Sequence, residues 1–159
     1  MIPFPSRKNF YLIIFFISLI SIISALYIEY ILQYEPCKLC IYQRLPYIAA
    51  IFVSLIGFNY SNNDQILIVI TMIFALSAII SGYHFGIENN IFDELSACAN
   101  DSLDISNKSK LLESLNQSMP VNCKDATFKI LGISLAAINT ILSILIVVFS
   151  IRTLVYEKN

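Results

Sequence analysis

Four long apolar stretches constrain this chain more than any other feature of its sequence. They cover residues 10–28, 41–60, 65–87 and 130–151. Their one residue from the set Asp, Glu, Lys and Arg is Arg44, near the start of the second stretch. Crossing the hydrocarbon core of a bilayer takes about 20 mostly apolar residues, whereas buried strands end after about 4–8 residues. The stretches therefore predict an all-α membrane protein, a four-transmembrane-helix bundle forming a single membrane domain over residues 1–159.

The composition agrees with this prediction and excludes several other classes of protein. Hydrophobic residues make up 57% of the chain, charged residues make up 13%, and the mean hydropathy is +0.73. A soluble domain has roughly 25% charged residues, and a disordered chain combines low hydrophobicity with high net charge. Ten Lys and Arg against eleven Asp and Glu leave a net charge of −1, so we expect no nucleic-acid partner.

Basic residues near the two ends of the chain predict its orientation. Arg7 and Lys8 precede the first stretch, and Arg152 and Lys158 follow the last. Because Lys and Arg are enriched on the cytoplasmic side of membrane helices, we expect both termini in the cytoplasm. The first stretch exceeds the apolar region of about 7–15 residues in a cleaved signal peptide, which favours an uncleaved signal anchor.

This topology puts two loops, residues 29–40 and 88–127, on the outer, periplasmic side of a bacterial inner membrane. Loops as long as the second are usually functional or disordered. Its apolar residues within residues 108–119 fall on one helical face, which is typical of a short amphipathic helix on the membrane surface. These residues are Leu111, Leu112, Leu115 and Met119. A solvated linker with a helical stretch explains the pattern equally well.

All four cysteines lie in these outer loops. Cys37 and Cys40 form a C-x-x-C pair, while Cys98 and Cys123 are single cysteines in the second loop. The outer face of a bacterial inner membrane is oxidising, so disulfides can persist there. Four cysteines allow three pairings, and the simplest resting arrangement joins Cys37 to Cys40 and Cys98 to Cys123.

Redox activity is the favoured interpretation of Cys37 and Cys40. Pro36 precedes the pair and the second helix follows it, so we expect the thiols at a helix N-terminus, which stabilises a thiolate. Arg44 lies one helical turn beyond Cys40 and is expected to lower the thiol pKa further. The thiolate is the attacking species in disulfide exchange. The alternatives are two structural disulfides for the sulfurs and, for Arg44, a side chain that extends to the interface.

Metal binding is a weaker interpretation, and we assign no metal ligand. A structural zinc site typically has two paired sets of ligands, and this chain has one C-x-x-C pair. A haem c site needs C-x-x-C-H, but Ile41 follows Cys40. A copper-binding thiolate pair stays open, although no Met or His lies nearby in the sequence to support it.

The segment PCKLCIYQR at residues 36–44 resembles the signature of the bacterial disulfide bond formation protein B family, DsbB. Three further features agree with the family: GYHFGIE at residues 82–88, the second cysteine pair, and LGISLAAIN at residues 131–139. The resemblance extends over residues 10–151. It implies a four-helix protein-disulfide oxidoreductase that reoxidises a periplasmic DsbA-like thioredoxin-fold protein and passes the electrons to a membrane quinone, usually ubiquinone.

The resemblance also implies a role for each residue of the site. Cys98 is attacked by the reduced partner and holds it as a mixed disulfide, and Cys123 passes the electrons onward. Cys37 accepts them by disulfide exchange, and Cys40 faces the quinone. Arg44 lies beside the quinone, where it favours the thiolate and the negative charge that develops on the ring.

His84 is the one histidine in the sequence, and it lies near the outer end of the third stretch with Glu88 four residues on. It is a candidate for quinone binding or proton relay, although a structural hydrogen bond at the interface is the favoured interpretation. Tyr42, Tyr47 and Tyr83 fit an interfacial aromatic belt as well as quinone contacts. Some family members carry Glu where this chain has Gln43, so a negative charge there is not needed for the expected chemistry.

Overall fold

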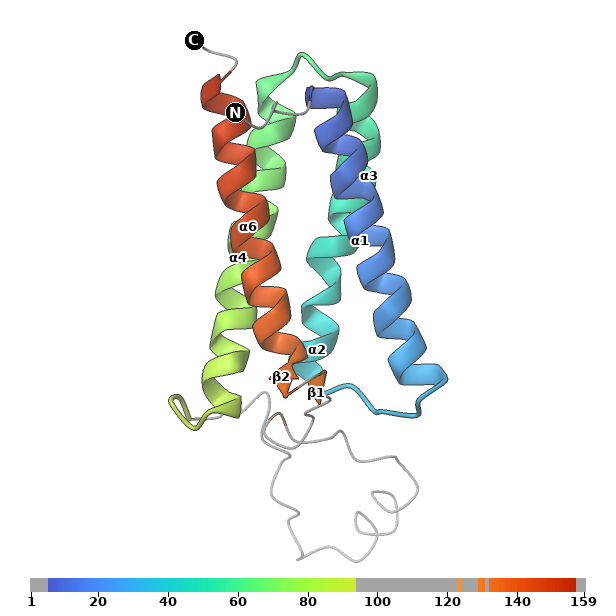
Figure 1. Ribbon diagram of the computed structural model, residues 1–159, viewed down its shortest axis with the longest axis vertical. Helices are drawn as coiled ribbons and strands as arrows, with labels where there is room; N and C mark the ends of the chain where they lie inside the picture. Colours follow the sequence, from blue (N-terminus) through green and yellow to red (C-terminus); the bar gives the residue numbers. More distant parts are fainter. Residues whose placement is uncertain (1–5, 94–122, 124–128, 131, 157–159) are drawn as a thin grey trace, which may run out of the picture.

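The computed structural model describes residues 6–93, 123, 129–130 and 132–156. The long helices are α1 (Arg7–Tyr30), α3 (Arg44–Asn59), α4 (Asp64–Glu88) and α6 (Leu135–Tyr156), and the short helix α2 (Lys38–Tyr42) precedes α3. With α2 and α3 taken together, this part of the chain has four helical spans long and apolar enough to cross a membrane. The predicted fold class, a four-helix membrane bundle, is confirmed (Figure 1).

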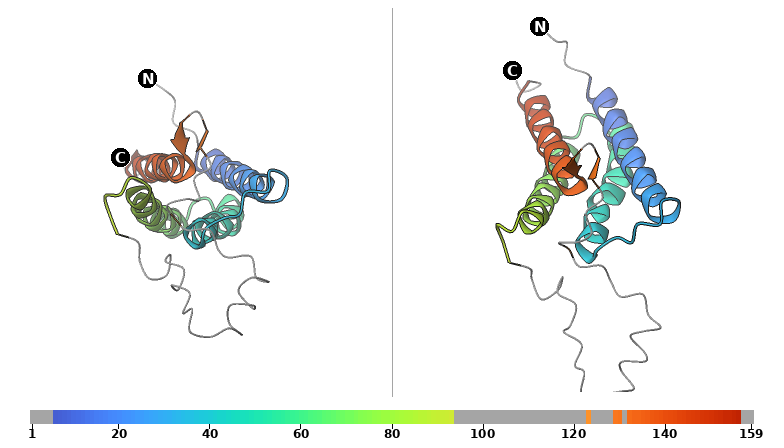
Figure 2. Two further views of the ribbon diagram at one scale, coloured as in Figure 1. Left: turned by 90° about the horizontal axis from the view of Figure 1, so that it is seen from below. Right: turned by 60° about the horizontal axis from the view of Figure 1, so that its bottom comes forward.

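The helices form a ring in the order α1, α3, α4, α6. Helix α1 packs along α3, α3 packs against α4, and α4 packs along α6. The end-on view in Figure 2 shows α6 and α1 completing the ring. The start of α1, the end of α6 and the turn between α3 and α4 lie at one end, and α2 lies at the other (Figure 1). The C-x-x-C pair is therefore remote from the end where the first helix begins.

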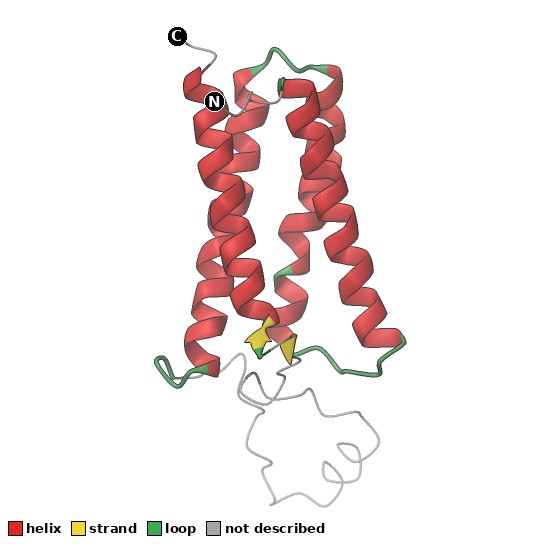
Figure 3. Ribbon diagram, in the orientation of Figure 1, coloured by secondary structure: helices red, strands yellow, loops and turns green. Residues whose placement is uncertain are grey.

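Pro46 interrupts the second span. Proline has no backbone N–H, so Pro46 cannot bond to the carbonyl of Tyr42 four residues earlier. Helix α2 accordingly ends at Tyr42 and α3 begins at Arg44, with Gln43 between them (Figure 3). The Gln43 side chain is buried inside the bundle, and the residue is 8% exposed.

The last span begins with a small hairpin, so α6 starts at Leu135 and not at residue 130. Strands β1 (Lys129–Ile130) and β2 (Ile133–Ser134) pair antiparallel. Gly132, between them, has φ +85°, a left-handed conformation that glycine adopts without strain. The Ser134 hydroxyl then accepts the N–H of Ala137 at 3.2 Å, which caps the first turn of α6.

Apolar side chains and small hydroxyls share the interior of the bundle. The core cluster draws on all four long helices: Phe10, Tyr11, Ile14, Tyr47, Ala50, Leu67, Ile70, Phe74 and Ile146. Between α4 and α6, the Ser143 hydroxyl donates to Ser77 at 3.1 Å, and Thr71 and Ser150 are hydrogen-bonded at 2.6 Å. Many large apolar side chains lie exposed on the outer faces, as expected for helices that contact lipid. The predicted amphipathic helix at residues 108–119 lies outside the described residues.

Candidate redox centre

Cys37 and Cys40 are free thiols in direct contact at the start of α2. Cys37 is the N-cap residue, and its Sγ accepts the backbone N–H of Cys40 at 3.2 Å. The two Sγ atoms are 2.8 Å apart. A disulfide bond is about 2.05 Å long, so the pair can oxidise after a small approach of the two sulfurs.

Cys37 itself is not an activated thiol. A hydrogen bond with the Cys40 sulfur, and then burial, raise the pKa of Cys37 to about 12. The side chain is fully buried, so water does not solvate a thiolate there. The pKa of Cys37 is therefore raised, opposite to the direction expected for a thiol at a helix N-terminus. Cys37 therefore keeps its proton at neutral pH.

Arg44 has a partner that sequence reasoning missed. Its guanidinium lies 2.5 Å from a carboxylate oxygen of Glu29 on α1, and both side chains are mostly buried. The sequence does place an arginine and a glutamate at the ends of adjoining spans, and such charges at the edge of a membrane usually pair. This pattern could have predicted the ion pair. The positive charge that was expected to act on the thiols is thus balanced by an acid on another helix.

The fold also places His84 beside Cys37. The His84 Nε2 atom lies 3.7 Å from the Cys37 Sγ and 3.7 Å from a Glu88 carboxylate oxygen. Its Nδ1 atom is hydrogen-bonded to the Gln43 amide at 2.9 Å. We expected no histidine near the C-x-x-C pair because none lies near it in the sequence. His84 is 47 positions from Cys37 in the sequence, but the fold brings the two side chains together.

A chain of amides anchors this histidine across the bundle. Asn139 on α6 donates to the Gln43 Oε1 at 2.9 Å, and the Tyr47 hydroxyl donates to the Asn139 Oδ1. Sequence reasoning gave Gln43 and Asn139 no role. Both residues are amides inside apolar stretches, where a polar side chain is usually functional or hydrogen-bonded. Their positions could therefore have predicted hydrogen bonds between helices.

The chain encloses a cavity of about 660 Å³ beside the thiols. Its walls come from α1, α6, the break between α2 and α3, and the end of α4. Its polar lining consists mainly of Glu29, Cys40, Gln43, Arg44, Tyr47, His84, Glu88 and Asn139, and most of its remaining wall is apolar. Small-molecule sites are about 300–1,000 Å³ and combine apolar walls with a few polar groups. The cavity therefore suits an apolar ligand that carries hydrogen-bond acceptors.

Cys123 lies beside the C-x-x-C pair. It is 1% exposed and packs in a small cluster with Cys37 and Ile87. Cys98 lies outside the described residues. Of the three tyrosines considered as quinone contacts, Tyr47 lines the cavity. Tyr42 is exposed, and Tyr83 stacks on Phe92.

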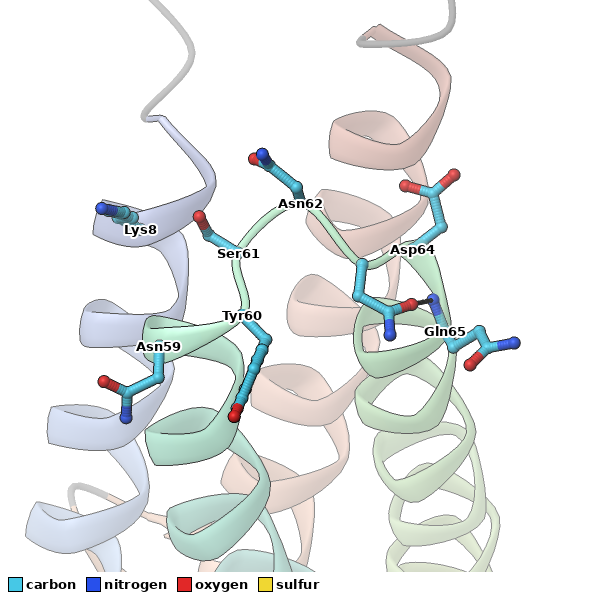
Figure 4. A pocket seen from close by; sticks show the side chains of 8 residues that line it. Lys8, Asn59, Tyr60, Ser61, Asn62, Asp64 and Gln65 are labelled. Carbon is cyan, nitrogen blue, oxygen red and sulfur yellow. Dashed lines mark hydrogen bonds between the residues drawn. The ribbon is translucent and has the colours of Figure 1, made fainter.

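A second depression, at the opposite end of the bundle, contains no thiol or imidazole. It surrounds the turn between α3 and α4 and is lined by Lys8, Asn59, Tyr60, Ser61, Asn62, Asn63, Asp64 and Gln65. Its labelled side chains do not converge on a common point (Figure 4). The Asn63 side chain caps α4 by accepting the N–H of Gln65 at 2.9 Å. The described residues that line this depression form a helix-capping turn and contain no candidate catalytic group.

Comparison with known proteins decides which family this arrangement belongs to. The family described as "Disulfide bond formation protein DsbB" matches residues 7–153. The chain belongs to the DsbB family. It is thus a multi-pass membrane protein of disulfide bond formation.

Relatives of this DsbB-family chain include proteins named disulfide bond formation protein B. An uncharacterised protein of Rickettsia prowazekii is 32% identical over 155 residues, covering 93% of this chain and 88% of the relative. Disulfide bond formation protein B of Saccharophagus degradans is 31% identical over 137 residues, which is 82% of each chain. The protein of the same name from Psychromonas ingrahamii is 35% identical over 57 residues, covering 36% of this chain and 31% of the relative.

Proposed function

We propose that this DsbB-family chain oxidises the dithiol of a periplasmic DsbA-like thioredoxin-fold protein and passes two electrons to a membrane quinone, ubiquinone by preference. Both termini then lie in the cytoplasm and the cysteines on the periplasmic side. One observation carries the proposal. The Cys40 sulfur contacts the Cys37 sulfur and also lines a largely apolar cavity at that end of the bundle.

The electrons reach this cavity by two thiol–disulfide exchanges. A partner thiolate attacks Cys98 of a Cys98–Cys123 disulfide, and Cys123 leaves as a thiolate. The second partner thiol resolves the mixed disulfide, so the partner leaves oxidised and the loop pair holds two electrons. Cys123 then attacks Cys37 of the Cys37–Cys40 disulfide, and Cys40 leaves as a thiolate. Cys98 then attacks Cys123 in the new bond and Cys37 leaves, which restores the loop disulfide and leaves Cys37 and Cys40 reduced. The packing of Cys123 against Cys37 supports this order.

The residues around Cys40 fit a quinone. The apolar walls suit its ring and tail, and the Arg44 guanidinium and His84 imidazole place N–H groups among the lining for ring oxygens. When bound, a quinone would be the oxidant, because it accepts the two electrons and two protons that re-formation of the Cys37–Cys40 disulfide releases. Cys37 keeps its proton and is hydrogen-bonded to Cys40, which leaves the Cys40 sulfur as the electron-rich atom at the cavity wall. The Glu29 carboxylate orients Arg44.

The test is quinone reduction by the purified full-length protein. Reduced DsbA-like protein and a ubiquinone analogue are mixed with it, and the quinone absorbance is followed. We expect turnover by the wild type, none by Cys40→Ser, and a raised KM for quinone in Arg44→Gln. Arg152→Gln, an exposed arginine near the far end of α6, is the matched control and should keep the wild-type KM. No reduction by the wild type, or full activity of Cys40→Ser, overturns the proposal.

A further inference from the structure

The reduced C-x-x-C pair belongs to a cluster with the donor set of a metal site. Cys37, Cys40 and His84 each present one ligand atom, and these atoms lie within 4.8 Å of one another. Glu88 adds a carboxylate oxygen 3.7 Å from the His84 Nε2. We propose that the dithiol form of this protein binds one Zn²⁺ through Cys37, Cys40, His84 and Glu88, and that oxidation to the disulfide abolishes the site. This inference is independent of the proposed function.

Two separations that His84 makes, to the Cys37 sulfur and to a Glu88 oxygen, are close to those of a tetrahedral zinc site. With Zn–S about 2.3 Å and Zn–N or Zn–O about 2.0 Å, such a site separates S from N by about 3.6 Å and N from O by about 3.3 Å. The corresponding distances are both 3.7 Å. The two sulfurs must move apart from 2.8 Å to about 3.8 Å. Cys40 lines the cavity and therefore has room for this movement.

Glu88 independently indicates a cation at this position. Its side chain is only 7% exposed, yet its Oε2 atom has no hydrogen-bond partner among the described residues. Burial of a carboxylate oxygen without a partner is costly, and a metal ion bound to that carboxylate lowers the cost. Glu88 also lines the same cavity as Cys40 and His84, so an ion that enters the cavity reaches all three side chains.

The chemistry of the donors favours zinc over copper. Two thiolates, one imidazole and one carboxylate are ligands that Zn²⁺ accepts together, whereas Cu⁺ prefers sulfur ligands. The amide of Gln43 already contacts the Nδ1 of His84 at 2.9 Å, the second ring nitrogen that ligating histidines use to fix their orientation. A 180° flip of both the Gln43 and the Asn139 amide exchanges their oxygen and nitrogen positions, and the Gln43 oxygen then accepts the Nδ1–H of His84.

Oxidation and zinc binding exclude each other at this site. Binding forms two Zn–S bonds and releases the two thiol protons to the medium, with no change in oxidation state. Disulfide formation removes two electrons from the same sulfurs and leaves neither as a thiolate ligand. Zinc bound to the reduced protein therefore protects the dithiol from oxidation until the ion leaves.

The first test measures zinc binding in two redox states of one polypeptide. Full-length protein carrying Cys98→Ser and Cys123→Ser is reduced with a phosphine or oxidised with diamide, so no quinone or partner enters the assay. Each sample receives zinc chloride, is desalted anaerobically and is analysed for metal. We expect one zinc per reduced chain and close to none per oxidised chain. Equal zinc content in the two states, or none in the reduced state, overturns the proposal whatever the outcome of the quinone assay.

The second test assigns the ligands by competition with a chromophoric chelator. We expect Glu88→Gln and His84→Gln to weaken zinc binding by at least about tenfold, because even the loss of a residue hydrogen-bonded to a ligand has an effect of that size. Glu35→Gln removes an exposed carboxylate from the same cavity lining and should leave the affinity unchanged. Cobalt(II) serves as a spectroscopic probe of the same site, because its ligation by sulfur gives a charge-transfer absorption band. The Cys37→Ser variant should weaken this band. Wild-type affinity in both Glu88→Gln and His84→Gln refutes the ligand set.

Discussion

The amide chain that holds His84 gives a stability prediction for Asn139→Ala. The Asn139 side chain accepts a hydrogen bond from Tyr47 and donates one to Gln43. Tyr47 is 5% exposed and Gln43 is 8% exposed. Alanine leaves both groups buried without this partner. Hydrogen bonds between membrane helices contribute on average about 0.6 and at most about 1.7 kcal/mol each. Two lost bonds therefore lower the free energy of unfolding by about 1–3 kcal/mol.

The measurement is the free energy of unfolding in mixed micelles with increasing dodecyl sulfate, followed by circular dichroism. Asn59→Ala is the matched control. The Asn59 side chain is exposed and donates at 3.0 Å to the Leu55 carbonyl within its own helix. Its loss should change the free energy by no more than about 0.5 kcal/mol, as for ordinary surface positions. Equal stability of Asn139→Ala and Asn59→Ala would show that the amide chain contributes nothing to the stability of the fold.

Two other predictions concern packing and ionisation. Gly57→Ala places a Cβ 2.6 Å from the ring of the fully buried Tyr11 and should destabilise the protein by about 1–3 kcal/mol. Gly82→Ala is the control, because its Cβ would lie 3.9 Å from Thr140 and should leave the stability unchanged. Equal melting temperatures of the two variants would contradict this prediction. In protein with Cys98→Ser and Cys123→Ser, the further change Cys40→Ala should lower the pKa of Cys37 from about 12, because the bond to Cys40 is the larger cause of the shift. Burial keeps this pKa above the ordinary thiol value, so ionisation still begins only in alkaline solution. Ultraviolet thiolate absorbance against pH measures the midpoint, and an unmoved midpoint would refute the assigned cause.

The fold was largely predictable because the decisive signal is local. A run of about 20 apolar residues can satisfy its backbone inside a membrane only as a helix, whatever its neighbours do. The break at Gln43 and the late start of α6 were not predicted. Each depends on a single residue inside an apolar stretch, Pro46 in one case and Gly132 in the other.

The site was predictable only in part. The C-x-x-C motif and its position before a helix were readable from residues that are adjacent in the sequence. The high pKa of Cys37 was not, because it depends on burial and on the side-chain geometry of Cys40. Glu29, Gln43 and Asn139 acquire their roles from contacts between helices, and no spacing within one helix indicates them.

By itself, the sequence determined that the chain has four membrane helices and that its C-x-x-C motif lies where the second begins, since both follow from local composition and order. Only the tertiary structure decided that His84 lies against Cys37, that Glu29 pairs with Arg44, and that Cys123 packs beside the thiols. The spanning helices are apolar over nearly their whole circumference, so their sequences do not indicate which face turns inward. That choice depends on how a few small and polar side chains fit together between helices, and it exists only once the bundle is packed.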